Sequence, residues 1–254
     1  VIATLFRLLK SFRLEGGVAI LNILALLGTF GLQVTILRLV RLPGEVDAYF
    51  AASTIPQLLW TILITTMSGA LVPFLATLKS DVRPFAGRRA LVLGLAVLLP
   101  ITLGLALSAP AWVSWIFTGI AKTAYGRICV ELSTLAILAA PALFAVAVLT
   151  AYHQASNLFI RVEGVNTAFT WLMLIAMAIA LPRVGVIAAG WILLARYYLQ
   201  ALALSTPFWV PGRRAVDLSP VRSRFGVLLA GNCYLKSEVL VDRHLLSRAT
   251  VGTL

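Results

Sequence analysis

The sequence predicts an all-α, polytopic membrane protein built around a six-helix transmembrane bundle. Of its 254 residues, 61% are hydrophobic and only 12% are charged, and the mean hydropathy is +0.98. A soluble domain is closer to half apolar and a quarter charged, so a soluble fold of this composition could not cover its surface with polar groups. No segment alternates apolar and polar residues between turn signals, which excludes a β-barrel.

Apolar stretches long enough to cross a bilayer recur along the chain. A spanning helix needs about 20 mostly apolar residues. Six stretches meet this length: 16–40, 48–77, 90–118, 128–152, 164–182 and 184–206. Pro182 and Arg183 separate the last two, where we expect a tight turn. A seventh helix is expected from near Phe225 to the end of the chain.

These elements divide the chain into three parts. Residues 1–206 are expected to form the six-helix lobe, and 225–254 a further helix. Between them, 207–224 is predicted to be a cytoplasmic linker, because it combines three prolines and a glycine with four arginines. Since the chain opens at Val1 and stops at Leu254 within a helical pattern, we expect it to be part of a longer protein.

The basic residues between the apolar runs predict an orientation. Cytoplasmic loops carry an excess of Lys and Arg. With the N-terminus inside, the inner segments hold twelve such residues and the outer segments five. The inner set is Arg7, Lys10, Arg13, Lys79, Arg83, Arg88, Arg89, Arg161, Arg213, Arg214, Arg222 and Arg224, and the outer set is Arg38, Arg41, Lys122, Arg127 and Arg183. We therefore expect a bacterial-type inner membrane protein with a cytoplasmic N-terminus.

The same clustering argues against other classes of protein. A net charge of +12 could indicate nucleic-acid binding, but the cations lie in short groups between apolar runs, as in membrane loops. His153 and His244 have no partners at metal or triad spacing, and no phosphate-binding loop is present. The sequence therefore predicts neither a nucleic-acid partner nor an enzyme, and no cofactor.

Charged residues inside apolar runs are the strongest local indication of function. Burying a charge at bilayer depth costs at least about 2.5 kcal/mol, so such a residue usually faces water or protein. Arg196 lies in the middle of the sixth run, too deep for its side chain to reach the membrane surface easily. We expect Arg196 to face a cavity and to bind substrate.

The seventh helix carries a polar stripe. At 100° per residue, one face collects Asn232, Lys236, Arg243, Ser247 and Thr250. Glu238 and Asp242 share a different face, where one carboxylate could hold a proton or a cation. The sequence leaves a second interpretation open, in which this segment is an amphipathic helix on the membrane surface.

Two patches resemble the MurJ/MviN-type lipid flippases of the multidrug/oligosaccharidyl-lipid/polysaccharide exporter superfamily. The first patch reads Asp47-Ala48-Tyr49-Phe50, then Ile55-Pro56-Gln57-Leu58-Leu59, then Leu71-Val72-Pro73-Phe74-Leu75. The second reads Leu240-Val241-Asp242-Arg243, followed by Ser247 and Val251-Gly252-Thr253-Leu254. The resemblance implies two six-helix lobes around a central cavity. This chain would hold the first lobe and the start of the second.

The resemblance also implies a function and a set of site residues. Such proteins move a polyprenyl-diphosphate-linked saccharide, a peptidoglycan precursor or exopolysaccharide unit, by alternating access. Arg38 and Asp47 match family charges, whereas Leu26, Leu32 and Trp60 stand where family members carry arginines. The expected substrate contacts are Arg38, Asp47, Arg196, Asn232, Lys236, Arg243 and Ser247. Asp242 is the expected ligand of a coupling Na⁺ or H⁺.

The sequence leaves two other functions open. A cation-coupled multidrug exporter of the same superfamily should have an acidic, aromatic-lined cavity, and the intramembrane cations argue against it. A polytopic membrane transferase should place clusters of His, Asp or Glu in the loops at one membrane face, and the sequence contains none.

Overall fold

The computed structural model describes residues 2–40, 42–209, 212 and 216–246, with side chains from residue 15 onward except 239, 240 and 242–246. All regular elements in these ranges are helices. They are α1 (Ile2–Leu39), α2 (Pro43–Thr77), α3 (Arg83–Leu107), α4 (Ala109–Ile116), α5 (Thr118–Ala121), α6 (Gly126–Leu138), α7 (Ala140–Ala155), α8 (Phe159–Val184), α9 (Ile187–Leu204), the 3₁₀ turn η1 (Thr206–Trp209) and α10 (Ser219–Leu246).

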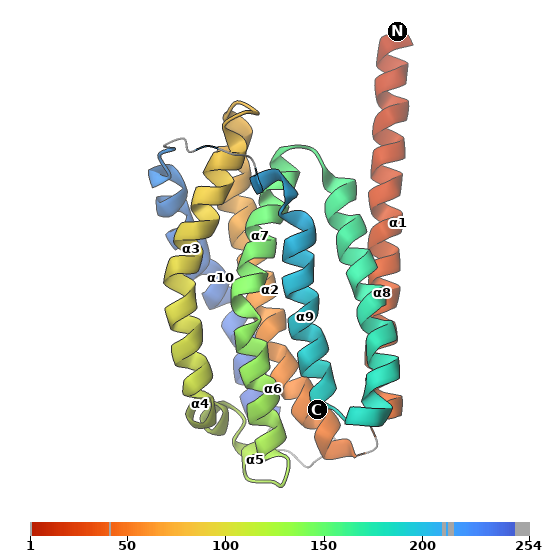
Figure 1. The fold of residues 1–254 in the computed structure, drawn as a ribbon, viewed down its shortest axis with the longest axis vertical. Helices are drawn as coiled ribbons and strands as arrows, with labels where there is room; N and C mark the ends of the chain where they lie inside the picture. Colours follow the sequence, from red (N-terminus) through yellow and green to blue (C-terminus); the bar gives the residue numbers. More distant parts are fainter. Residues whose placement is uncertain (1, 41, 210–211, 213–215, 247–254) are drawn as a thin grey trace.

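Six helical segments of this bundle are long and apolar enough to cross a membrane, which confirms the predicted fold class. They are 15–39, 43–77, 83–107, 126–155, 159–184 and 187–204. They run up and down side by side, with the ends of successive spans joined at alternating ends of the bundle (Figure 1). The chain is therefore an all-α membrane protein with several spans.

Three of the expected boundaries are corrected by the structure. The predicted run 90–118 breaks at Ser108 into α3 and α4, and the run 128–152 breaks at Ala139 into α6 and α7. In both breaks a proline sits in the first turn of the following helix, where its missing N–H costs no hydrogen bond. The expected turn at Pro182 and Arg183 is wrong.

Both of those residues belong to α8, and the turn lies at Gly185. The φ angle of Gly185 is 85°, a left-handed conformation that glycine adopts without steric cost. The Gly185 N–H donates to the carbonyl of Leu181 at 3.0 Å and closes the last turn of α8.

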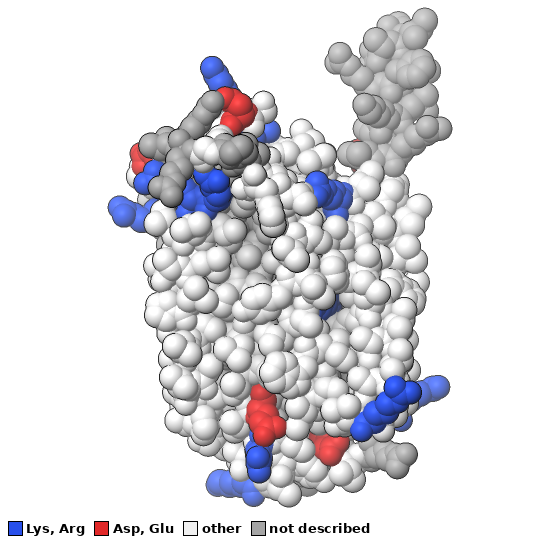
Figure 2. Space-filling model, in the orientation of Figure 1, with Lys and Arg blue, Asp and Glu red and all other residues white. Residues whose placement is uncertain are grey.

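The segment formed by α6 and α7 lies at the centre of the bundle. In its most apolar window 83% of residues are buried, against 6% in the corresponding window of α3. α7 contacts α2, α3 and α9, whereas α1 packs mainly against α8. On the face shown in Figure 2, an almost uncharged belt lies between two ends where charged side chains gather. The outward faces of the peripheral helices are therefore suited to contact lipid.

Two arginines near the start of α3 form hydrogen bonds with the connection that precedes α10. Arg88 donates to the carbonyl of Gly212, and Arg89 donates to the carbonyl of Val216 at 2.8 Å. α10 then begins at Ser219, inside the predicted linker 207–224, and the Asp217 carboxylate before it accepts hydrogen bonds from the Ser219 backbone N–H and hydroxyl. Over its described residues α10 does not reach the apolar character of a spanning helix, and it packs against α2.

Candidate functional site

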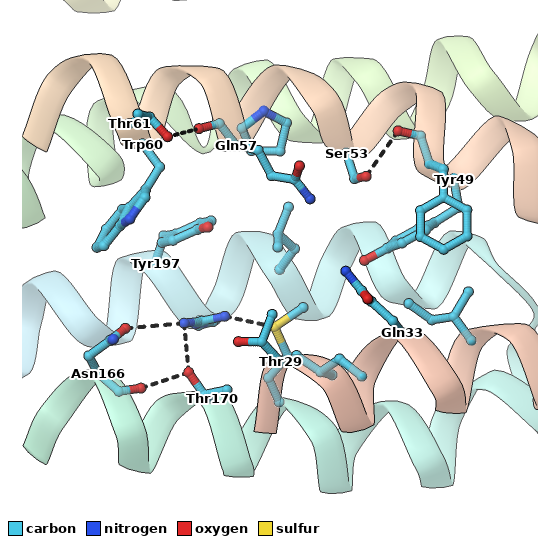
Figure 3. Close-up of a pocket in the computed structure, with 17 residues that line it drawn as sticks. Thr29, Gln33, Tyr49, Ser53, Gln57, Trp60, Thr61, Asn166, Thr170 and Tyr197 are labelled. Atoms are coloured by element: carbon cyan, nitrogen blue, oxygen red, sulfur yellow. Dashed lines mark hydrogen bonds between the residues drawn. The ribbon is translucent and has the colours of Figure 1, made fainter. Parts of the chain in front are cut away.

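A cavity of about 410 Å³ lies between α1, α2, α8 and α9 (Figure 3). It reaches the surface between α1 and α2, where the polar residues Thr29, Gln33, Gln57 and Thr61 are exposed. The described lining residues are Thr29, Leu32, Gln33, Ile36, Tyr49, Phe50, Ser53, Pro56, Gln57, Trp60, Thr61, Asn166, Thr170, Met173, Leu193, Arg196 and Tyr197.

Arg196 supplies the charge of this cavity. It lies near the middle of the 18-residue helix α9 and is held by α8. Its Nη2 donates to the Thr170 hydroxyl at 2.9 Å and to the Asn166 side-chain oxygen at 3.3 Å, and its Nη1 contacts the Met173 sulfur at 3.4 Å. These three partners follow one another at helical spacing, so a single face of α8 fixes the guanidinium.

The positive charge of Arg196 is not neutralised by the described residues. No described carboxylate lies within ion-pairing distance of the guanidinium, and none lines the cavity. The Nε of Arg196 is buried and has no hydrogen-bond partner. Among the described residues, the guanidinium charge at membrane depth is compensated by neutral oxygens, a sulfur and the Tyr197 ring. The arrangement favours an anionic ligand.

Aromatic and amide side chains from α1, α2 and α9 also line the cavity. Trp60 stacks on Tyr197 with ring centroids 5.9 Å apart, and the Arg196 guanidinium lies 5.5 Å from the Tyr197 ring centre. The side chains of Gln33 and Gln57 extend into the space between α1 and α2 (Figure 3). Amide groups can donate and accept hydrogen bonds, whereas the rings offer apolar faces. The cavity can thus bind a ligand with both an anionic and a hydroxyl-rich part.

The structure separates the residues predicted to form one substrate site. Arg38 lies at the end of α1 in a second cavity, 610 Å³ in volume, and does not line the Arg196 cavity. Asp47 is buried on α2 and lines neither cavity. Asn232 donates to the Thr66 hydroxyl at 3.0 Å, so it faces the contact between α10 and α2.

The remaining predicted residues lie on α10 or beyond it. Lys236 is half-buried on α10 and does not line the Arg196 cavity. The side chains of Asp242 and Arg243, and Ser247 as a whole, lie outside the described residues. Within the described residues, no group of three His, Cys, Asp or Glu side chains could hold a metal ion.

The sequence predicts that Arg196 faces a cavity, but it does not identify the residues that bind its guanidinium. Asn166, Thr167 and Thr170 are polar residues inside the apolar fifth run, and this clustering was an available signal. Thr167 instead donates to the carbonyl of Leu21 on α1 at 3.0 Å. The sequence could not distinguish the residue that joins α8 to α1 from those that hold Arg196.

Comparison with protein-family models, with curated proteins and with solved structures finds no match. The fold and the site therefore define the class on their own. The chain is a polytopic α-helical membrane protein, and between four of its helices lies a cavity whose one charged group among the described lining residues is an arginine.

Proposed function

We propose that this chain is one lobe of a membrane flippase that moves a polyprenyl-diphosphate-linked saccharide across the bilayer. The observation that carries the proposal is the Arg196 guanidinium, which faces a cavity at membrane depth and has no carboxylate partner among the described residues. A diphosphate supplies the missing negative charge through charge-assisted hydrogen bonds. The hydroxyl groups of a saccharide suit the amides of Gln33 and Gln57.

The same observation weighs against a cation-coupled multidrug exporter, the second candidate within the superfamily. A site for cationic drugs needs acidic side chains, and the described lining of the cavity has none.

The proposed protein is not an enzyme, and it acts in a bacterial inner membrane with its N-terminus in the cytoplasm. Its partners are the lipid-linked oligosaccharide and the surrounding lipids, and Na⁺ or H⁺ on Asp242 drives transport.

Binding of a polyprenyl diphosphate lipid to the purified full chain tests the proposal. In the variant Arg196→Gln we expect affinity to fall about 10- to 100-fold, since a hydrogen bond to a charged group contributes about 1.5–3 kcal/mol. Arg127→Gln is the matched control, because Arg127 is exposed and pairs with Glu131 outside the cavity. Equal affinity in both variants, or tighter binding of a cationic dye than of the diphosphate lipid, would reject the proposal.

A further inference from the structure

A second cavity lies at the end of the bundle where α1 stops, α2 starts and α8 turns into α9. Its volume is 610 Å³, within the range of about 300–1,000 Å³ that ligand sites occupy. The wall is mostly apolar and includes Leu39, Leu42, Leu181 and Val186. Spans 15–39 and 159–184 end here, so the cavity lies where a membrane's head-group layer meets its acyl chains.

Two opposite charges line this cavity without pairing. Arg38 is in the last turn of α1 and Glu45 is in the first turn of α2. No ion pair or hydrogen bond joins them to each other, and neither has a charged partner among the described residues. Each charge is favoured by the dipole of its own helix, because Arg38 lies at a C-terminus and Glu45 at an N-terminus.

Opposite charges that line one cavity, with no partner for either among the described residues, match a ligand that carries both signs. A phosphate would meet the fork of Arg38, which is suited to bidentate contacts with phosphate oxygens. An ammonium group would meet the carboxylate of Glu45. The apolar wall would cover the glycerol backbone and the first methylenes of the acyl chains, since removing CH₂ groups from water is favourable.

We propose that this cavity binds an aminophospholipid, with the phosphate on Arg38 and the primary ammonium on Glu45. A primary ammonium donates hydrogen bonds to a carboxylate, whereas the quaternary ammonium of a choline head group has no N–H to donate. The site therefore selects phosphatidylethanolamine over phosphatidylcholine. The proposal is independent of the Arg196 cavity, which shares no lining residue with this one.

Native mass spectrometry of the purified full chain in equimolar phosphatidylethanolamine and phosphatidylcholine tests this site. We expect the ethanolamine lipid to be retained about tenfold more than the choline lipid, as one charge-assisted hydrogen bond would give. Glu45→Gln should abolish this preference, and Arg38→Gln should lower the retention of both lipids. Arg127→Gln and Glu131→Gln are the matched controls, because this exposed pair lies on α6 and lines neither cavity.

Several results would overturn the proposal. Equal retention of the two lipids by the unaltered chain would do so, and so would an unchanged preference in Glu45→Gln. Stronger retention of phosphatidylglycerol than of phosphatidylethanolamine would indicate a site for anions alone. Displacement of the lipid by an equal concentration of soluble phosphoethanolamine would show that the apolar wall does not contribute and that the ligand is not a lipid.

Discussion

Arg196 on α9 donates a 2.9 Å hydrogen bond to the hydroxyl of Thr170 on α8. The Thr170 hydroxyl itself donates to the carbonyl of Asn166 at 2.8 Å, so its lone pairs remain directed at the guanidinium. This pair fixes the only charge among the described lining residues of the mid-membrane cavity. Because the partners of Arg196 are neutral, they orient its charge without cancelling it.

Replacing Thr170 with Val should weaken anion binding while Arg196 remains in place. The variant removes one of the acceptors that orient the guanidinium, and we expect the affinity for a polyprenyl diphosphate lipid to fall about 3- to 10-fold. Equilibrium binding to the purified chain measures this change. Thr134→Val is the control, because the Thr134 hydroxyl bonds only within its own helix, to the Val130 carbonyl. A similar loss in both variants would contradict an orienting role.

The contact between α10 and α2 should contribute to stability and not to ligand binding. Asn232→Ala removes the 3.0 Å hydrogen bond to the Thr66 hydroxyl, and Thr66 is fully buried. We expect a loss of about 1 kcal/mol in the free energy of unfolding, measured in denaturant. Ser237→Ala, on an exposed position of α10, should change stability less. If Asn232→Ala weakens diphosphate-lipid binding as much as Arg196→Gln, Asn232 belongs to the ligand site.

The start of α10 should be sensitive to acid. Hydrogen bonds from the Ser219 hydroxyl and backbone N–H lower the pKa of the Asp217 carboxyl below its ordinary value of 3.8, and the charges of Arg89 and Arg222 act in the same direction. A lowered pKa in the folded state stabilises this turn above pH 3.8, and the stabilisation is lost as the pH falls through the folded-state pKa.

Hydrogen exchange of the amides in 219–222 measures this effect in the unaltered chain and in Asp217→Asn. The asparagine keeps an acceptor but no charge. At neutral pH we expect these amides to exchange more slowly in the unaltered chain than in Asp217→Asn. The difference between the two chains should disappear below the folded-state pKa of Asp217. A difference that does not change with pH would show that the charge of Asp217 is not involved.

The side of the membrane on which each loop lies should follow the unequal distribution of basic residues between the two sets of loops. Ser80 and Thr123 lie in connections at opposite ends of the bundle, so single cysteines there should react from opposite sides of the membrane. We expect Ser80→Cys to be labelled from the cytoplasm and Thr123→Cys from outside, with Cys129 and Cys233 first replaced by alanine. Labelling with the two sides exchanged would reverse the proposed orientation.

The spans could be predicted because hydropathy alone determines them, whereas the helix breaks could not. Pro110 and Pro141 start new helices after Ser108 and Ala139 without any change in apolar composition. Likewise, Gly185 rather than Pro182 ends α8, because proline is tolerated inside membrane helices and the positive φ of Gly185 takes the chain out of the helix. These differences concern the local backbone and leave the number of spans unchanged.

For the site, the sequence could locate a charge but not its surroundings. Arg196 was identified because a cation within an apolar run is costly. The pairing with Thr170 depends on the register of α8 against α9, which no local pattern encodes. Similarly, the polar stripe of the seventh helix predicted a cavity-facing Asn232. The partner of Asn232 is Thr66, because α10 packs against α2 away from the face that lines the cavity.

We expect the complete flippase, of which this chain is the proposed lobe, to flip a labelled polyprenyl diphosphate saccharide in proteoliposomes. In Arg196→Gln the rate of head-group translocation should fall at least about tenfold, and Arg196→Lys, which keeps the charge but not the planar fork, should retain partial activity. Arg127→Gln should transport at the unaltered rate. Unchanged translocation in Arg196→Gln, or no translocation by the unaltered complete protein, would refute a flippase role for the Arg196 cavity.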